Sequence, residues 1–249
     1  APLVDEAKAL ISGQSRTYGH AIVDEAQDLS PMELRMLARR CPSGSMTLLG
    51  DLAQAVGPWG RRDWQDLASG LPGGDEARVV ELRFGYRSTA QVLDLANRLL
   101  PEAAPGVRPT VAVRPGRSSP RLLGGGEVGV VAVEEARRLA ETWPTVAVIA
   151  PRPRIAGLLA DLRDSDSLDV ADADEGGLGR QVTIVSATGA KGLEFDAVVV
   201  VAPDEIVAER PDRAAGLRLL YVALTRPTQH LSIVAGANVP DQLVATPAR

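Results

Sequence analysis

The sequence predicts an α/β protein built on largely parallel β-sheets. Runs of Val, Ile and Leu recur along the 249 residues, and amphipathic stretches separate them. The apolar runs are continuous rather than alternating, which is typical of strands that helices cover on both faces. The two observations together favour helices layered around a parallel sheet.

Seven apolar runs have the length and β-branched content of strands, at residues 21–23, 46–49, 79–82, 146–150, 182–187, 197–201 and 231–235. Five amphipathic stretches predict helices, at residues 31–40, 88–100, 134–142, 154–162 and 213–225. Ser30 is expected to cap the first of these helices, with Pro31 in its first turn. Ser88 is expected to cap the second, with Gln91 in a capping box.

Two segments predict irregular structure. Residues 101–126 are rich in Pro, Gly and Arg, and we expect at most short strands there. Residues 164–179 are acidic and then Gly-rich, which indicates an exposed, mobile loop. A boundary near residues 84–85 is expected to divide the chain into residues 1–84 and 85–249.

Composition excludes several classes of protein. The net charge of -5 argues against a basic coat for nucleic acid, although it is compatible with a local basic groove. Cys41 is the only cysteine, which excludes an internal disulfide and favours a reducing, cytoplasmic setting. The longest apolar run, residues 197–203, is too short to cross a bilayer, and no signal-peptide pattern opens the chain.

Asp24 and Glu25 follow the first predicted strand directly. Neighbouring carboxylates at the carboxyl end of a strand suit magnesium-dependent nucleotide hydrolysis, because one can hold the hydrated metal while the other orients or deprotonates water. Such a pair on a solvated turn is the alternative. Gln54 follows the second strand within the run GDLAQ, residues 50–54, where its amide could position water or sense phosphate; an ordinary Gly-Asp turn is the alternative there.

Three later segments add cationic and glycine-rich positions. Arg87 lies at a predicted helix start, where backbone N–H groups and an arginine can bind an anion; a surface arginine beside a cap is the alternative. Residues 188–195, TGAKGLEF, follow a strand, and their two glycines permit close approach to a ligand. Arg226 ends the last predicted helix, where a cation alone stabilises by roughly 0.3–1 kcal/mol.

In this order, the segments resemble the motifs of superfamily 1 helicases of the UvrD/Rep type. VDEAQD resembles motif II, GDLAQ motif III, FGYRS motif IV, AKGLEF motif V and LYVALTR motif VI. The run DEAQDLSPMELRML and the short span between motifs IV and V look most like the HelD, or helicase IV, branch. The resemblance implies RecA-like sheets: the end of domain 1A in residues 1–84, then domain 2A in residues 85–249, without a 2B insertion.

The resemblance also implies roles for single residues. Asp24 would hold Mg²⁺, Glu25 would orient or deprotonate the hydrolytic water, and Gln54 would contact the γ-phosphate. Arg87 and Arg226 would act as arginine fingers on ATP, each capable of contributing about 10³–10⁵ in rate.

Further implied contacts lie in motif V, where Glu194 would bind the ribose and Lys191 and Gly192 would line the nucleotide site. Four residues would contact single-stranded DNA: Trp59 by stacking on a base, Arg61 and Arg62 beside it, and Thr188. Stacking of this kind contributes about 1–3 kcal/mol per base. A tryptophan that packs in a core or between domains is the alternative for Trp59.

Two positions depart from the family pattern. Gly57 stands where many relatives have a tyrosine, and Thr188 stands at the usual histidine of motif V. Both departures weaken the inference of strand displacement more than that of nucleotide binding. The alternative function is therefore a HelD-like ATPase that remodels or releases RNA polymerase.

No G-x-x-x-x-G-K-[ST] phosphate loop occurs in the sequence. We therefore expect the chain to be the C-terminal portion of an ATP-dependent DNA helicase, contributing half of an ATP site whose remainder belongs to the N-terminal part of domain 1A. The chain alone is expected to bind ATP poorly and to hydrolyse it negligibly, because the phosphate-loop Lys and Ser/Thr neutralise the phosphates and hold the metal.

Overall fold

The computed structural model describes residues 2–13, 16–61, 63–116, 118–164, 168–177 and 179–244. The chain divides into two compact units, Ala1–Glu81 and Leu82–Arg249. This division lies close to the expected boundary at residues 84–85. The assignment of the two units to domains 1A and 2A stays a prediction.

The first unit is built around two parallel strands. Its elements are α1 (Pro2–Ser12), β1 (Ala21–Val23), α2 (Pro31–Arg40), β2 (Met46–Leu48) and α3 (Trp64–Ala68). Strands β1 and β2 pair from Ala21 opposite Met46 to Val23 opposite Leu48. The core of this unit gathers Ala26, Leu34 and Leu67, with Val23 and Leu48 from the strands packed against them. The strands at 21–23 and 46–48 confirm the sequence prediction.

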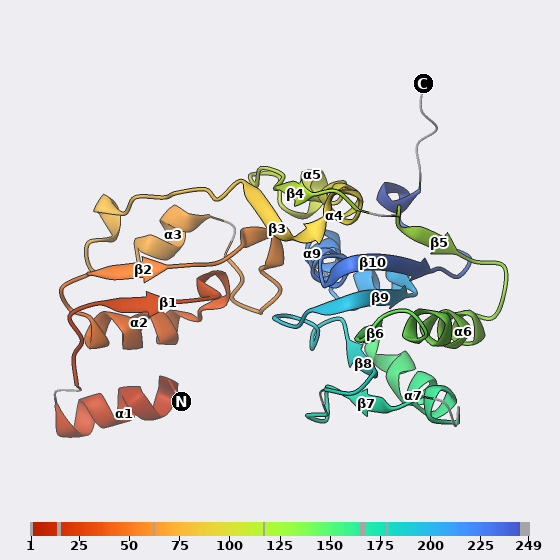
Figure 1. Cartoon of the computed structure of the whole chain (residues 1–249). Helices are drawn as coiled ribbons and strands as arrows, with labels where there is room; N and C mark the ends of the chain where they lie inside the picture. Colours follow the sequence, from red (N-terminus) through yellow and green to blue (C-terminus); the bar gives the residue numbers. More distant parts are fainter. Residues whose placement is uncertain are drawn as a thin grey trace. The chain divides into compact units, whose positions relative to one another are not determined.

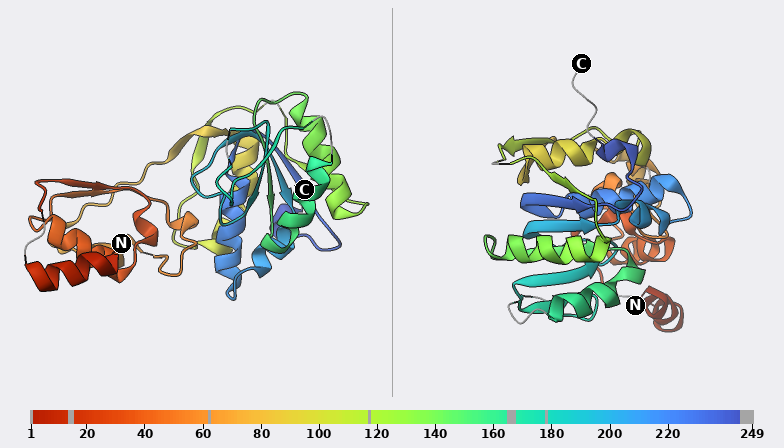
Figure 2. Two further views of the ribbon diagram at one scale, coloured as in Figure 1. Left: turned by 90° about the horizontal axis from the view of Figure 1, so that it is seen from below. Right: turned by 90° about the vertical axis from the view of Figure 1, so that its right-hand side faces the viewer.

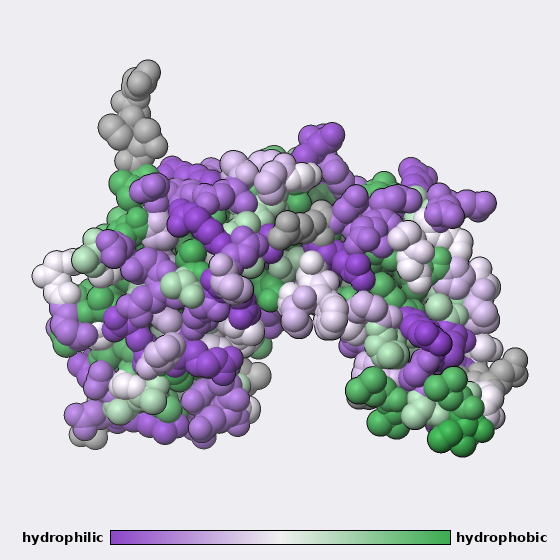
Figure 3. Space-filling view, turned by 180° about the vertical axis from the view of Figure 1, so that it is seen from behind, coloured by the Kyte–Doolittle hydropathy of each residue, from purple (hydrophilic) through white to green (hydrophobic). Residues whose placement is uncertain are grey.

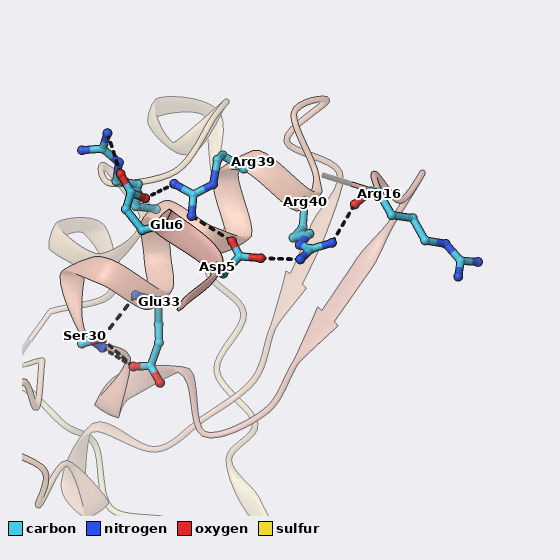
Figure 4. Close-up of polar contacts among 8 residues, drawn as sticks. Asp5, Glu6, Arg16, Ser30, Glu33, Arg39 and Arg40 are labelled. Atoms are coloured by element: carbon cyan, nitrogen blue, oxygen red, sulfur yellow. Dashed lines mark hydrogen bonds and ion pairs between the residues drawn. The ribbon is translucent and has the colours of Figure 1, made fainter. Parts of the chain in front are cut away.

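Helix α2 begins and ends where the sequence predicts, and Ser30 caps it. The Ser30 Oγ accepts a hydrogen bond from the Glu33 backbone N–H at 3.2 Å, and a Glu33 carboxylate oxygen accepts one from the Ser30 backbone N–H at 2.8 Å (Figure 4). This reciprocal capping box satisfies two backbone donors that the helix leaves unpaired. The hydrogen bonds from the Ser30 hydroxyl and backbone hold the pKa of Glu33 below its ordinary value.

Helix α1 was not predicted from the sequence, and it docks on α2 through ion pairs. Asp5 binds Arg39 at 2.8 Å and also pairs with Arg40, while Glu6 binds Arg35 at 3.0 Å and pairs with Arg39 (Figure 4). The hydrogen bond from Arg39, followed by that from Arg40, lowers the pKa of Asp5. Helix α1 carries exposed apolar side chains, and Leu3, Leu10 and Ile11 are 72%, 75% and 84% exposed. Figure 3 shows a patch of hydrophobic residues on the surface of the molecule.

The second unit contains a six-stranded parallel sheet with the strand order β5-β10-β9-β6-β8-β7 (Figure 1). Strands β3 and β4 form a separate parallel pair. The strands are β3 (Phe84–Thr89), β4 (Val111–Arg114), β5 (Arg121–Leu123), β6 (Val146–Ala150), β7 (Val170–Asp172), β8 (Val182–Ser186), β9 (Phe195–Val201) and β10 (Pro227–Val234). The helices are α4 (Ala90–Asn97), α5 (Leu100–Ala103), α6 (Val128–Ala140), α7 (Ile155–Arg163), α8 (Pro203–Ala208) and α9 (Arg213–Leu224).

Helices cover both faces of this sheet: α6 and α7 lie on one face, and α4 and α9 lie on the other (Figure 2). Every residue of β6 (VAVIA) and of β8 (VTIVS) is buried. Burial on both faces is why β6 is apolar throughout rather than alternating. The predicted class, α/β with parallel sheets, is confirmed. The part of the chain that the structure describes contains no helix long and apolar enough to cross a membrane.

Several predicted boundaries are wrong for physical reasons. Residues 79–82 form no strand, and Val79, Val80 and Leu82 are 52%, 64% and 81% exposed. Thr89 rather than Ser88 precedes α4, and the Ser88 hydroxyl instead donates to the Pro227 carbonyl at 3.0 Å. The expected capping box is also absent at this helix start, because the Gln91 side chain bonds to Gly116.

Helix α6 begins six residues before the predicted start, inside the run VGVVAV. Glu127 makes this possible, because its carboxylate accepts hydrogen bonds from the backbone N–H groups of Gly129 at 3.1 Å and Val130 at 2.8 Å. The expected loop over residues 164–179 contains strand β7, in which Ala171 and Asp172 are buried. Residues 101–126 were expected to contain at most short strands, and the strands found there are β4 and β5.

A buried polar network crosses from α6 to β10. Glu135, only 5% exposed, accepts hydrogen bonds from Arg138 at 2.7 Å, Arg121 at 3.0 Å and the Ser232 hydroxyl at 2.5 Å. Burial acts to raise the pKa of Glu135, but the hydrogen bonds from Arg138 and Ser232 outweigh it and hold the pKa below its ordinary value. The His230 ring bonds to the Ser232 hydroxyl at 3.2 Å. Burial, followed by the charge of Arg138, lowers the pKa of His230.

This network predicts a loss of stability in mild acid. The pKa of His230 in the folded chain lies below its ordinary value of 6.5, so the unfolded chain binds more protons in the window between the two values. The free energy of unfolding should therefore fall as the pH drops from 6.5 toward the folded pKa. Denaturant unfolding at pH 7.5 and pH 5.5 would measure this, and His230→Gln should reduce the difference. His20→Gln, which removes the other imidazole from an exposed position, is the control; a pH effect that survives His230→Gln would contradict the assignment.

Candidate functional site

The two carboxylates after β1 occupy an exposed, strained turn. Asp24 and Glu25 are both exposed, and Glu25 has a φ of 54°, in the left-handed region that non-glycine residues seldom adopt. The Asp24 Oδ1 accepts a hydrogen bond from the Glu25 backbone N–H at 2.8 Å. The turn leads directly into the 3₁₀ helix Ala26–Asp28. It therefore presents two adjacent acidic side chains at the carboxyl end of the strand.

Gln27 connects these carboxylates to the second strand. Its side chain is fully buried, its amide nitrogen donates to the Glu25 carboxylate at 2.5 Å, and its amide oxygen accepts from the Asp51 backbone N–H at 3.1 Å. Gly50 permits this arrangement, because a Cβ there would lie 2.0 Å from the Gln27 amide oxygen. Gln27 was not among the site residues predicted from the sequence. Its polar side chain between Ala26 and Asp28 was the available signal, but its burial was not visible in the sequence.

Gln54 belongs to the same chain of contacts. The Asp51 carboxylate caps the 3₁₀ helix Leu52–Gln54 by accepting from the Ala53 backbone N–H at 2.8 Å, and it also accepts from the Gln54 side-chain amide at 2.9 Å. Since Asp51 is bonded through its own backbone to Gln27, hydrogen bonds link Glu25 to Gln54. The structure thus connects the predicted hydrolytic carboxylate with the predicted γ-phosphate sensor.

Trp59 and Arg61 line an open depression in the first unit. Pro31, Pro58, Gly60, Asp63 and Asp66 complete its lining. Trp59 is 54% exposed, so it is not a core tryptophan within this unit. Arg61 forms an ion pair with Asp66 at 2.7 Å, which already balances its charge. Arg62 lies outside the described residues.

The glycine at position 57 packs against an acidic side chain. The Gly57 backbone N–H donates to the Asp28 carboxylate at 3.0 Å, and a Cβ at position 57 would also lie 3.0 Å from that oxygen. A tyrosine at this position would require Asp28 to move.

In the second unit, the structure brings Arg87 and Glu194 together. Arg87 of β3 forms an ion pair with Glu194, just before β9, at 2.6 Å, and both side chains are about half exposed. The backbone carbonyl of Arg87 accepts from the Arg114 guanidinium at 2.8 Å. The hydrogen bond from Ser88 to Pro227 further joins β3 to the start of β10. Two residues predicted to contact the same nucleotide are therefore neighbours.

Arg226 is buried rather than exposed. The residue is 2% exposed, and its guanidinium donates to the backbone carbonyls of Val222 at 2.9 Å and Leu193 at 3.3 Å. Its Nη2 also donates to the Thr225 hydroxyl at 3.1 Å. These contacts fasten the end of α9 to the segment that carries Glu194. The proposed finger thus has a structural role in the arrangement described.

The segment 188–194, called the motif V loop below, carries the remaining predicted contacts. Gly192 has a φ of 79°, and a Cβ there would meet open space. The Thr188 hydroxyl accepts a hydrogen bond from Arg210 at 3.4 Å, and Lys191 is partly buried. Across the described parts of the chain, no group of three or more His, Cys, Asp or Glu side chains is arranged to hold a metal ion.

Comparisons with known proteins connect this second unit to a helicase family. Residues 181–234 match the family model of the UvrD-like helicase C-terminal domain. Over 90 residues, the chain is 34% identical to the ATP-dependent DNA helicase UvrD2 of Mycobacterium bovis and of Mycobacterium tuberculosis H37Rv. These matches cover 34% of this chain and 12% of each relative, so the chain spans a small part of the relatives' length.

A solved structure is also similar. The C-terminal domain of a possible DNA helicase from Lactobacillus plantarum WCFS1 aligns with a TM-score of 0.48 and 23% identity, over 64% of this chain and 92% of that one. These relatives give no support to the narrower HelD assignment. Together, the family match and the UvrD2 relatives show that part of this chain is similar to UvrD-type helicases.

Proposed function

We propose that this chain is the C-terminal part of an ATP-dependent superfamily 1 DNA helicase or translocase. It would supply some of the residues that hydrolyse ATP and part of the groove for single-stranded DNA. The observation that carries the proposal is the ion pair of Arg87 with Glu194, because it joins two helicase-like motifs that lie far apart in the sequence. The UvrD2 relatives, named as ATP-dependent DNA helicases, support the same reading.

In the first unit, Asp24, Glu25 and Gln54 would serve hydrolysis. Asp24 fits Mg²⁺, because it is an exposed carboxylate and Mg²⁺ is usually held by one or two protein carboxylates together with water. The bound metal would neutralise charge on the phosphates. Glu25 would orient or deprotonate the attacking water while Gln27 holds its carboxylate, and Gln54 would contact the γ-phosphate.

In the second unit, Arg87 and Glu194 would give up their ion pair and each bind ATP instead. A guanidinium binds phosphate oxygens as readily as it binds carboxylate oxygens. The Arg87 side chain can therefore leave Glu194 and bind the γ-phosphate. Glu194 would then accept hydrogen bonds from the ribose hydroxyls. Lys191 and Gly192 would line the site of the same nucleotide. Arg226, in motif VI, would help to balance the negative charge of the transferring phosphoryl group.

For nucleic acid, Trp59 offers a half-exposed ring on which a base can stack without sequence preference. Arg61 is paired with Asp66, so it would have to break this ion pair to contact a DNA phosphate. The Thr188 hydroxyl would contact the DNA backbone. The expected substrate is single-stranded DNA.

Glu25→Gln tests this proposal in the full-length parent that we propose, a longer protein with a phosphate loop. We expect DNA-stimulated ATP turnover to fall by about 10²-fold or more, because a positioned general base typically contributes 10²–10⁴. ATP binding should persist, since the glutamine oxygen can still accept from Gln27. Glu76→Gln, at an exposed position of the same unit, is the matched control. Unchanged turnover in Glu25→Gln would refute the assigned role.

A second candidate is a HelD-like ATPase that remodels or releases RNA polymerase. It is favoured by two departures from the family pattern, Gly57 at the usual tyrosine position and Thr188 at the usual histidine position. Strand-unwinding and polymerase-release assays on the full-length parent separate the two candidates. Unwinding without polymerase release would exclude the second, and the converse would exclude the first.

A further inference from the structure

We propose that Asp174 is a positioning residue that fixes the motif V loop in the conformation needed for nucleotide and DNA contact. The inference rests on the proposed function, because this loop carries Thr188, Lys191 and Glu194. Asp174 lies between β7 and β8, in a segment whose sequence indicates only an exposed acidic loop. Its contacts assign it a more specific role.

Both carboxylate oxygens of Asp174 bind the end of β8. One accepts a hydrogen bond from the Ser186 backbone N–H at 2.8 Å, and the other accepts from the Ser186 hydroxyl at 2.9 Å. Ser186 is fully buried. The Ser186 hydroxyl oxygen in turn accepts from the Gly189 backbone N–H at 3.1 Å. One carboxylate therefore sets the strand end and, through one hydroxyl, the first turn of the motif V loop.

The turn that presents Asp174 is itself anchored to the sheet. The Asp172 carboxylate, in a residue only 7% exposed, accepts from the Asp174 backbone N–H at 2.9 Å. The Ala173 backbone N–H donates to the Ile184 carbonyl at 3.0 Å. The turn that carries Asp174 is therefore held in place by hydrogen bonds and is not a loosely held segment.

Packing also brings the carboxylate against the backbone of the motif V loop. A Cβ at Gly189 would lie 2.2 Å from the Asp174 carboxylate and 3.0 Å from a methyl group of Val185. A side chain at position 189 would therefore displace Asp174. Further along, the Ala190 backbone N–H donates to the Ser186 carbonyl at 2.9 Å, and the Leu193 backbone N–H donates to the Ala190 carbonyl at 3.1 Å. These bonds extend the anchored geometry toward Glu194.

The test uses Asp174→Ala, Ser186→Ala and the double variant in the full-length parent. We expect the KM for ATP and the half-saturating concentration of single-stranded DNA both to rise about tenfold, because hydrogen bonds to a charged acceptor are worth roughly a factor of ten. The double variant should lose little more than Asp174→Ala, since the two residues act in one chain of contacts. Asp169→Ala is the matched control, because Asp169 pairs with Arg180 on the exposed surface.

Amide hydrogen exchange provides a readout that does not depend on ATP. In the 249-residue chain, Asp174→Ala should speed exchange across residues 186–194, and Asp169→Ala should not. If the unmodified parent shows no DNA-stimulated ATPase, the proposed function fails, and the exchange result alone then supports or overturns the anchoring. If the parent is active, an unchanged KM for both ligands overturns the inference and leaves the proposed function standing. A loss confined to the apparent kcat, which reduced folding alone would cause, also overturns it.

Discussion

Arg87→Ala is expected to lower DNA-stimulated ATP turnover of the full-length parent by about a thousandfold, the lower end of the contribution of an arginine finger. The physical reason is the loss of a guanidinium that would balance the charge of the transferring phosphoryl group. The fold should be unaffected, because the Arg87 side chain is about half exposed and its ion pair with Glu194 is largely solvated. Steady-state turnover at saturating ATP and DNA measures the effect.

Two further variants make this result specific to Arg87. Arg87→Lys should restore only part of the activity, because an ammonium group cannot reproduce the planar donors of the guanidinium. Arg83→Ala, at an exposed position in the segment just before β3, is the control and should turn over ATP like the unmodified parent. Full activity of Arg87→Ala would remove this residue from the hydrolytic step.

Arg226→Ala is expected to have two large effects. In the 249-residue chain, the free energy of unfolding should fall by roughly 2–4 kcal/mol, because the buried carbonyls of Val222 and Leu193 lose their charged donor. In the full-length parent, turnover per folded molecule should fall by about 10³ if the guanidinium also balances phosphoryl charge. Denaturant unfolding and active-site-titrated turnover measure the two effects separately.

Arg226→Lys distinguishes the structural role from the catalytic one. Lysine keeps the charge and can donate to one of the buried carbonyls, so most of the stability should return. Turnover should remain low, because lysine lacks the planar donor arrangement. A lysine variant that regains both stability and turnover would show that Arg226 acts only by holding α9 to the motif V loop.

The sequence predicted most reliably where burial or local capping decides the structure. Strand β6 and helix α2 lie within the predicted bounds, because a Val-rich run and a Ser-Pro cap specify them locally. The strand expected at residues 79–82 failed, because β-propensity requires a neighbouring strand and an apolar environment. Helix α6 began early, because its β-branched first turns resemble a strand until Glu127 caps them.

The candidate residues could be selected from motif order, but their contacts could not. The pairing of Arg87 with Glu194 joins residues that lie far apart in the sequence, and their proximity depends on how β3 meets the start of β10. The sequence placed Arg226 at a helix end, but it did not indicate that the residue would be buried. Gln27 and Asp174 were not identified, because an amide or a carboxylate in a short polar run gives no sign of what it will contact after folding.

The proposed function assigns both Glu25 and Arg87 to ATP hydrolysis by the full-length parent. A double-variant experiment in the full-length parent tests it most directly, by comparing the turnover of Glu25→Gln, Arg87→Ala and the two combined. Residues that act as a unit have strongly non-additive effects on the rate. We therefore predict that the double variant turns over ATP about as slowly as the slower single variant. If the fold losses in turnover of the two single variants multiply in the double variant, the two residues act in independent steps and the prediction is wrong.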